Sequence, residues 1–110
     1  MLSRVGAVVV FVGLTLLFTT SPGSTETIRI DIAKLAYTPA EITAHVGDTV
    51  LWVSGDFVVH SATATNKAWD VTIPLKGSAS VVLKSAGIAY FCRFHPNMKG
   101  RITVTDTTSP

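Results

Sequence analysis

The sequence predicts an all-β domain, an antiparallel sandwich or barrel of about eight short strands. Two observations lead to this prediction. Several short segments alternate apolar and polar residues with a period of two, the pattern of a strand with one face in a core. Turn-forming glycine, proline and asparagine residues separate these segments, and no segment after the N-terminal region has the apolar spacing of a convincing helix.

Each strand is predicted from its own segment. The first is expected at 27–32, where isoleucines alternate with polar residues, and Pro39 interrupts the chain after it. Gly47 and Asp48 form a typical turn pair between the next two strands. We expect those two strands at 41–46 and 48–53, and the remaining five at 58–64, 68–73, 80–84, 88–92 and 101–105.

The strand at 88–92 determines where the cysteine points. Alternation places Ile88, Tyr90 and Cys92 on one face, so if that face lies in the core, the thiol points inward at the strand end. Pro96 and Gly100 bracket the turn that follows. In the same way, Trp52 is expected in the core, Trp69 at an edge or exposed, and His45 on a polar strand face without a ligand role.

The N-terminal region has the features of a secretory signal peptide. A basic leader that ends at Arg4 precedes a largely apolar run from Val5 to Phe18. This run of about fourteen residues is shorter than the roughly twenty that span a bilayer as a helix, so a retained anchor is the less favoured alternative. We therefore expect a leader over 1–23, cleavage before Ser24, and one exported domain over 24–110.

The charge balance argues against a nucleic-acid partner. The chain has nine basic and seven acidic residues, so removal of Arg4 leaves eight against seven and a net charge near +1. No basic cluster of the kind that binds phosphates is present. Arg93, Lys99 and Arg101 surround the last loop, where they form either a positive rim for an acidic partner or an ordinary solvated surface.

A single cysteine cannot form an internal disulfide, so Cys92 is a free thiol, an intermolecular bridge or a metal ligand. His95 and Met98 follow it at intervals of three residues. A thiolate, an imidazole and a thioether on one short loop are the ligands of a copper site. The best candidate for a second imidazole is His60, which follows the turn residues Gly55 and Asp56 and an apolar stretch.

These residues resemble the cupredoxins, the small blue copper proteins. The similar features are the run Gly47-Asp48-Thr49-Val50-Leu51-Trp52, Asp56, His60-Ser61, Gly87, Tyr90, and the Cys92-x2-His95-x2-Met98 loop before Gly100. The short ligand loop is most similar to that of amicyanin. The resemblance implies a Greek-key β-sandwich in which His60, Cys92 and His95 are equatorial copper ligands and Met98 is a weak axial ligand.

The resemblance also implies what surrounds the site and what the protein does. Where the family often has asparagine after the first histidine, this chain has Ser61, which still offers an amide and a hydroxyl to join the two ligand loops. The implied function is electron transport by a monomeric, non-enzymatic periplasmic carrier. His95 is the implied electron exit, within an apolar apron of Phe57, Val58, Pro96, Asn97 and Met98.

The implied redox partners are a periplasmic dehydrogenase as donor and a c-type cytochrome as acceptor. The alternative is a copper carrier or storage protein that does not cycle its metal, although such proteins usually present several methionines and only Met98 remains after Met1. A copper oxidase subunit would need a second metal site. Zinc also suits one cysteine and two histidines, but an axial methionine argues against it. A catalytic cysteine paired with His95 lacks further catalytic groups.

Overall fold

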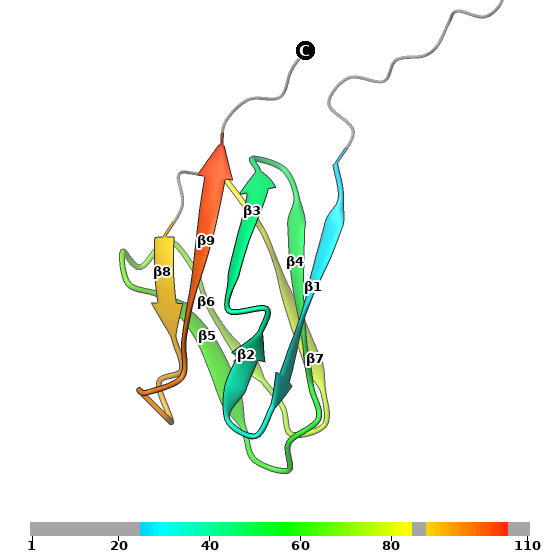
Figure 1. Ribbon diagram of the computed structural model, residues 1–110, viewed down its shortest axis with the longest axis vertical. Helices are drawn as coiled ribbons and strands as arrows, with labels where there is room; N and C mark the ends of the chain where they lie inside the picture. Colours follow the sequence, from blue (N-terminus) through cyan, green and yellow to red (C-terminus); the bar gives the residue numbers. More distant parts are fainter. Residues whose placement is uncertain (1–24, 85–87, 106–110) are drawn as a thin grey trace, which may run out of the picture.

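The computed structural model describes residues 25–84 and 88–105 (Figure 1). The predicted leader at 1–23 lies outside the described residues. Within them the chain forms nine strands and no helix, in two sheets that pack face to face, so the predicted all-β sandwich is confirmed. The described part of the chain contains no apolar helix that could cross a membrane.

The first sheet has four strands in the order β2-β1-β4-β7. Its outward residues are polar or small at most positions, and its inward residues include the fully buried Ile30, Ile32, Val50 and Trp52. The strands are β1 (Thr27–Ala33), β2 (Ala36–Thr38), β4 (Thr49–Ser54) and β7 (Ser78–Val82).

The second sheet has five strands in the order β3-β9-β8-β5-β6. Within this sheet β5 and β8 are antiparallel neighbours, and the site described below lies beside them. The strands are β3 (Glu41–His45), β5 (His60–Ala64), β6 (Asp70–Ile73), β8 (Ile88–Phe91) and β9 (Lys99–Thr105).

Both sheets are mixed rather than wholly antiparallel. Strand β1 pairs parallel with β4, and β3 pairs parallel with β9. The turn expected at Gly47-Asp48 is present, and Gly47 has φ 98°, a conformation that glycine adopts without strain. However, β3 and β4 on either side of this turn belong to different sheets. The chain crosses the sandwich here, so each strand pairs with a partner that is distant in sequence.

The buried carboxylate of Asp48 supports that crossing. It accepts hydrogen bonds from the backbone N–H of Glu26 and of His45, each at 2.9 Å. Burial raises the pKa of Asp48, but these backbone hydrogen bonds and the nearby His45 outweigh burial and hold the pKa below its usual value. His45 itself is exposed, as expected.

Strand β2 is an element that the sequence analysis missed. It follows a tight turn in which Lys34 and Leu35 have φ values of 54° and 61°, without the glycine or asparagine that usually signals such a turn. The strand has only three residues, and its central residue, Tyr37, is buried. Its position matters because Tyr37 contacts the ligand loops.

The core contains a cluster of aromatic rings between the sheets. Trp52 is fully buried, as predicted, and its indole N–H donates to the Tyr90 hydroxyl at 3.2 Å. Trp69 is partly buried rather than exposed, with its ring centroid 5.5 Å from those of both Trp52 and Tyr90. Burial raises the pKa of Tyr90 to about 12, so this hydroxyl remains protonated at neutral pH.

Four connections lie at one end of the sandwich, the lower end in Figure 1. They are the β1–β2 turn and the β4–β5, β6–β7 and β8–β9 loops. Because β5 begins at this end and the antiparallel β8 finishes there, the start of one strand lies beside the end of the other. The fold thereby brings His60 and Cys92 together.

Candidate metal centre

Three of the four predicted ligands form a tight cluster. His60 is the first residue of β5, Cys92 directly follows β8, and His95 lies on the next loop. One donor atom from each lies within 4.8 Å of the others. The Cys92 sulfur is 3.8 Å from His60 Nδ1 and 3.6 Å from His95 Nδ1. Two imidazole nitrogens therefore face one sulfur, in a space that fits a single metal ion.

The three side chains differ in their access to solvent. His60 and Cys92 are 0% exposed, whereas His95 is partly exposed. The burial of Tyr90 and Cys92 confirms the strand face predicted for the thiol. Of the three cluster residues, His95 is therefore the one that reaches the surface.

Met98, the fourth predicted ligand, is held next to His95 by the backbone of the loop. Its N–H donates to the His95 carbonyl at 2.8 Å, and its own carbonyl accepts from the Cys92 N–H at 3.1 Å. These bonds close the loop tightly. Met98 is 3% exposed, so it contributes little surface to the apron in which it was expected, although it lines a hollow beside His95.

Ser61 joins the two ligand segments, as expected from its position after His60. Its backbone N–H points at the Cys92 sulfur, with the nitrogen 3.4 Å from Sγ. Its hydroxyl oxygen accepts from the Arg93 N–H at 2.8 Å. A hydrogen bond to a ligating sulfur stabilises its thiolate form and tunes the metal. Both bonds cross from β5 to the loop after β8, so they fix the sulfur relative to His60.

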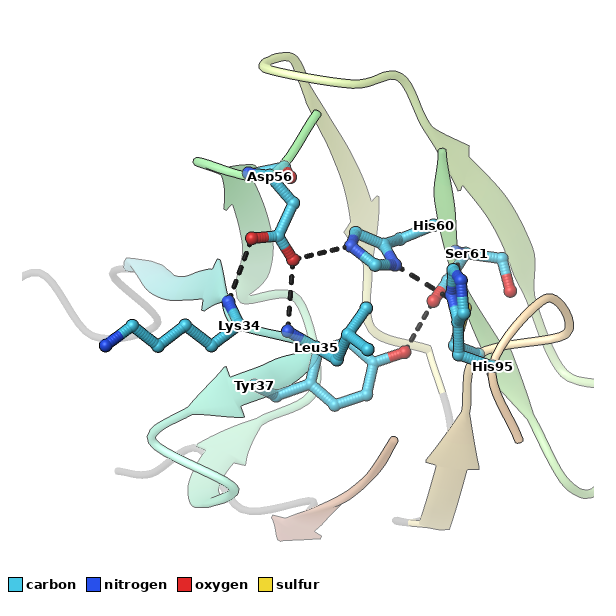
Figure 2. A network of polar contacts seen from close by, with 9 residues as sticks. Lys34, Leu35, Tyr37, Asp56, His60, Ser61 and His95 are labelled. Atoms are coloured by element: carbon cyan, nitrogen blue, oxygen red, sulfur yellow. Dashed lines mark hydrogen bonds and ion pairs between the residues drawn. The ribbon is translucent and has the colours of Figure 1, made fainter. Parts of the chain in front are cut away.

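Asp56 contacts the other side of His60, a contact that spacing alone did not predict. Its Oδ2 lies 2.8 Å from His60 Nε2 (Figure 2). The carboxylate also accepts from the N–H groups of Lys34 and Leu35 at 2.8 and 3.1 Å. Burial raises the pKa of Asp56, but hydrogen bonds from Leu35, His60 and Lys34 outweigh it and bring the pKa below its ordinary value.

This contact assigns the two nitrogens of the buried imidazole. An ionised carboxylate only accepts hydrogen bonds, so Nε2 of His60 carries the proton. In the neutral imidazole Nδ1 is then the nitrogen with the lone pair, and it faces Cys92, as a ligand nitrogen must.

Tyr37 completes the surroundings of the cluster. Its hydroxyl donates to the Ser61 carbonyl (Figure 2). Its ring centroid is 4.7 Å from that of Tyr90. Burial and the nearby Cys92 raise the pKa of Tyr37 well above its usual range, so the hydroxyl remains a donor. No sequence signal pointed to Tyr37, because β2 itself was not predicted.

The positive rim differs from the one expected. Arg93 forms an ion pair with Asp70 at 3.1 Å and a hydrogen bond to Thr72, so its charge is already partnered. Lys99 and Arg101 line a hollow over β8 and β9 that also contains Glu41. Two other exposed cations lie at this end of the sandwich. Lys34 is in the β1–β2 turn, and Lys76 Nζ is 4.8 Å from the Phe57 ring centroid.

The surface beside His95 is apolar. Phe57 and Val58 are 76% and 45% exposed, as expected for the apron, and Pro96 and Asn97 are exposed too. Two residues not expected there are Leu35 and Phe94, each 49% exposed. Leu35 lines a hollow together with His95, Pro96, Asn97 and Met98.

Comparisons with known proteins agree with this geometry. No family model matches the chain. Amicyanin from Paracoccus versutus is 29% identical over 86 residues, an alignment that covers 72% of this chain and 65% of that protein. The match therefore spans slightly less than two thirds of the relative's length.

Solved structures give the same result. The crystal structure of amicyanin from Paracoccus versutus has a TM-score of 0.63 at 26% identity, covering 72% of this chain and 81% of that one. A mutant of amicyanin in a Cu(I) state has a TM-score of 0.63 at 26% identity, covering 72% and 82%. Sequence and fold are thus both similar to amicyanin, and the His60-Cys92-His95 cluster lies where the β4–β5 and β8–β9 loops meet, so the chain has a cupredoxin fold with a His-Cys-His cluster.

Proposed function

We propose that this protein binds one copper ion between His60, Cys92 and His95, with Met98 as a weak axial ligand, and carries single electrons. The observation that supports this most directly is the placement of two imidazole nitrogens at 3.6 and 3.8 Å from one buried sulfur. A trigonal set of two histidines and one cysteine with a weak axial methionine is the donor set of blue-copper electron-transfer sites.

Bound copper would supply a one-electron couple between Cu(I) and Cu(II). The residues of this chain supply a rigid frame for it. Ser61 donates to the Cys92 sulfur, Asp56 accepts from His60, and backbone bonds close the loop from Cys92 to Met98. A site whose ligands are held by strand ends and hydrogen bonds keeps its geometry when the charge changes, which favours fast electron transfer.

His95 is the proposed path for electrons to and from the surface. It is partly exposed, and it lines a hollow together with the apolar side chains of Leu35, Pro96 and Met98. A redox partner would dock on this face briefly, over a small interface typical of electron-transfer encounters. By similarity to the cupredoxins, we propose a periplasmic dehydrogenase as donor, a c-type cytochrome as acceptor, and export of the protein as a monomer after cleavage of the leader.

This proposal assigns the protein no catalytic activity of its own. The second candidate is a copper carrier or storage protein that keeps its metal in one oxidation state. The donor set is chemically compatible with that role and with zinc. The hydrogen bonds that fix the candidate ligands favour cycling, because a rigid frame keeps the site geometry similar in both oxidation states.

The test is titration of the purified protein with Cu(II), followed in the visible spectrum. We expect an intense blue thiolate-to-copper band that ascorbate bleaches and an oxidant restores. Cys92→Ser should abolish the band. His45→Ala is the matched control, because His45 is exposed and lies outside the cluster, and it should leave the band unchanged. A colourless complex in the unmodified protein would instead favour metal carriage or zinc.

A further inference from the structure

One carboxylate is shared between a buried histidine and a surface turn. We infer that Asp56 is a positioning residue that couples the orientation of His60 to the conformation of the Lys34–Leu35 turn. The inference rests on the proposed function for the identity of the metal. The contacts that support it involve only this chain, so they can be tested without copper.

Asp56 accepts three hydrogen bonds with its two oxygens, as Figure 2 shows. Oδ1 accepts from the Lys34 N–H at 2.8 Å, while Oδ2 accepts from the Leu35 N–H at 3.1 Å and from His60 Nε2 at 2.8 Å. The backbone of Asp56 is also fixed. Its N–H donates to Ser54 Oγ at 3.1 Å, and its carbonyl accepts from the Lys76 N–H at 2.9 Å. The carboxylate is therefore held in one orientation.

On the interior side, this carboxylate determines how His60 is presented. His60 is fully buried, and its two ring nitrogens face Asp56 and Cys92. A proton on Nε2 directed at Asp56 leaves the Nδ1 lone pair toward the cluster. Partners of this kind fix the tautomer and ring plane of metal-binding histidines, and their loss typically costs 10- to 100-fold in metal affinity.

On the surface side, the same carboxylate holds a turn that its residues disfavour. Lys34 and Leu35 both have positive φ, at 54° and 61°, in a region that residues with a Cβ rarely adopt. Their two N–H groups converge on Asp56, which gives this conformation its hydrogen-bond partners. In this conformation Leu35 lines the hollow beside His95 and Met98.

The two roles meet at Oδ2, which accepts from both Leu35 and His60. A displacement of the turn removes a donor from the oxygen that orients His60. A partner that presses on the Leu35 face therefore acts on the buried ligand through Asp56, in addition to any contact with His95.

The first arm of the test is Asp56→Asn, compared with Asp31→Asn. An amide has one acceptor oxygen and a donor nitrogen, so it cannot satisfy all three donors. In the metal-free protein, we expect the His60 Nε2–H proton and the Leu35 amide proton to exchange faster by NMR. We also expect the Zn(II) affinity to fall 10- to 100-fold. Asp31 is exposed and bonded only to Arg29 among the described contacts, so its variant should change neither quantity.

The second arm changes the turn and leaves Asp56 intact. Leu35→Val disfavours positive φ because valine is β-branched, whereas Leu35→Asn tolerates it. Coupling predicts faster exchange of the His60 proton and weaker Zn(II) binding in Leu35→Val, and values close to those of the unmodified protein in Leu35→Asn.

The inference is overturned if Asp56→Asn behaves like Asp31→Asn, or if Leu35→Val speeds exchange of the turn amides and leaves the His60 proton unaffected. The second arm decides the matter if Asp56→Asn does not fold. Failure of the proposed function has a different signature, since the unmodified protein would then lack the blue copper band whatever the NMR result.

Discussion

At the scale of single residues, Gly100 leaves the least room for a side chain among the glycines that the structure describes, because it packs against Tyr90. A Cβ added at Gly100 would lie 2.5 Å from Cζ of the Tyr90 ring and 2.6 Å from its hydroxyl oxygen. The two residues are register partners on β9 and β8. Tyr90 cannot easily move, because its hydroxyl accepts from Trp52 and its ring packs on Tyr37.

We therefore expect Gly100→Ala to destabilise the protein by about 1–3 kcal/mol, the usual cost of overpacking. Urea unfolding of the metal-free protein measures this loss. Gly55→Ala is the control, because its Cβ would meet only the Ile32 carbonyl at 3.6 Å, an ordinary contact. Its effect should stay within about 1 kcal/mol. Equal stability of the two variants would show that the Tyr90 ring can shift.

The candidate ligands were also visible at this scale, but the contacts that surround them were not. Cys92, His95 and Met98 are three residues apart, so the chemistry of their loop is visible in the sequence. The bond from the Ser61 amide to the Cys92 sulfur joins residues 31 positions apart. Such a bond exists only once β5 and the end of β8 are neighbours.

At the scale of elements, the crossing from β3 to β4 depends on the buried carboxylate of Asp48. It accepts from the N–H groups of His45 and Glu26, and it joins the turn to the start of β1. These bonds require the ionised form, which is why the pKa of Asp48 lies below its usual value despite burial.

A lowered pKa in the folded state has a definite consequence for stability. The stabilisation that the Asp48 carboxylate gives the folded state is present above its unfolded pKa of about 4. It is lost as the pH falls through the lower pKa that Asp48 has in the folded state. We expect Asp48→Asn to cost about 2 kcal/mol at pH 7, in line with hydrogen bonds to a charged group. Its unfolding free energy should then fall less steeply than that of the unmodified protein between pH 5 and pH 3.

Urea unfolding of the metal-free protein across this pH range is the measurement. Asp31→Asn is the comparison, since the Asp31 carboxylate is exposed and contacts Arg29 on the surface. If the curves of Asp48→Asn and the unmodified protein ran parallel, the Asp48 hydrogen bonds would not be the source of the pH dependence.

At the scale of the whole molecule, an apolar face and two cations lie at the same end as the metal cluster. Phe57, Val58, Leu35 and Phe94 are exposed there, and Lys34 and Lys76 belong to the connected segments. Asp56, in the β4–β5 loop beside these residues, is acidic, but its carboxylate already accepts from three hydrogen-bond donors. This face is therefore apolar and positive, which favours a partner with an acidic rim.

Small redox reagents can test the charge of this face without the natural partner. In the copper-loaded protein, Lys34→Glu combined with Lys76→Glu should slow oxidation by the anionic hexacyanoferrate(III) by about tenfold at low salt. The same variant should speed oxidation by a cationic cobalt(III) complex. Both effects should shrink as salt is added, because screening shortens the range of the charges.

The matched control is Lys67→Glu combined with Lys84→Glu. Lys67 follows β5 and Lys84 follows β7, so both lie at the opposite end of the sandwich from the cluster. The change in net charge is identical. Equal effects of the two double variants would mean that overall charge, rather than the face beside His95, governs the rate.

The sequence by itself determined the strand composition of this protein and the chemistry of its ligand loop. Alternation with a period of two and turn residues are local features, and they predicted the strands other than β2, with ends shifted by a few residues. The spacing of Cys92, His95 and Met98 is local as well. For the same reason, the loop chemistry could be predicted without knowledge of the fold.

The tertiary structure alone decided the parallel pairing of β1 with β4 and β3 with β9, the turn before β2, and the connection from Asp56 to both His60 and that turn. The turn forms without glycine, and its N–H groups donate to a carboxylate 22 residues away from Lys34 in the chain. These features depend on contacts between distant segments. Such contacts leave no periodic signal in the sequence, since they form only when the two sheets pack.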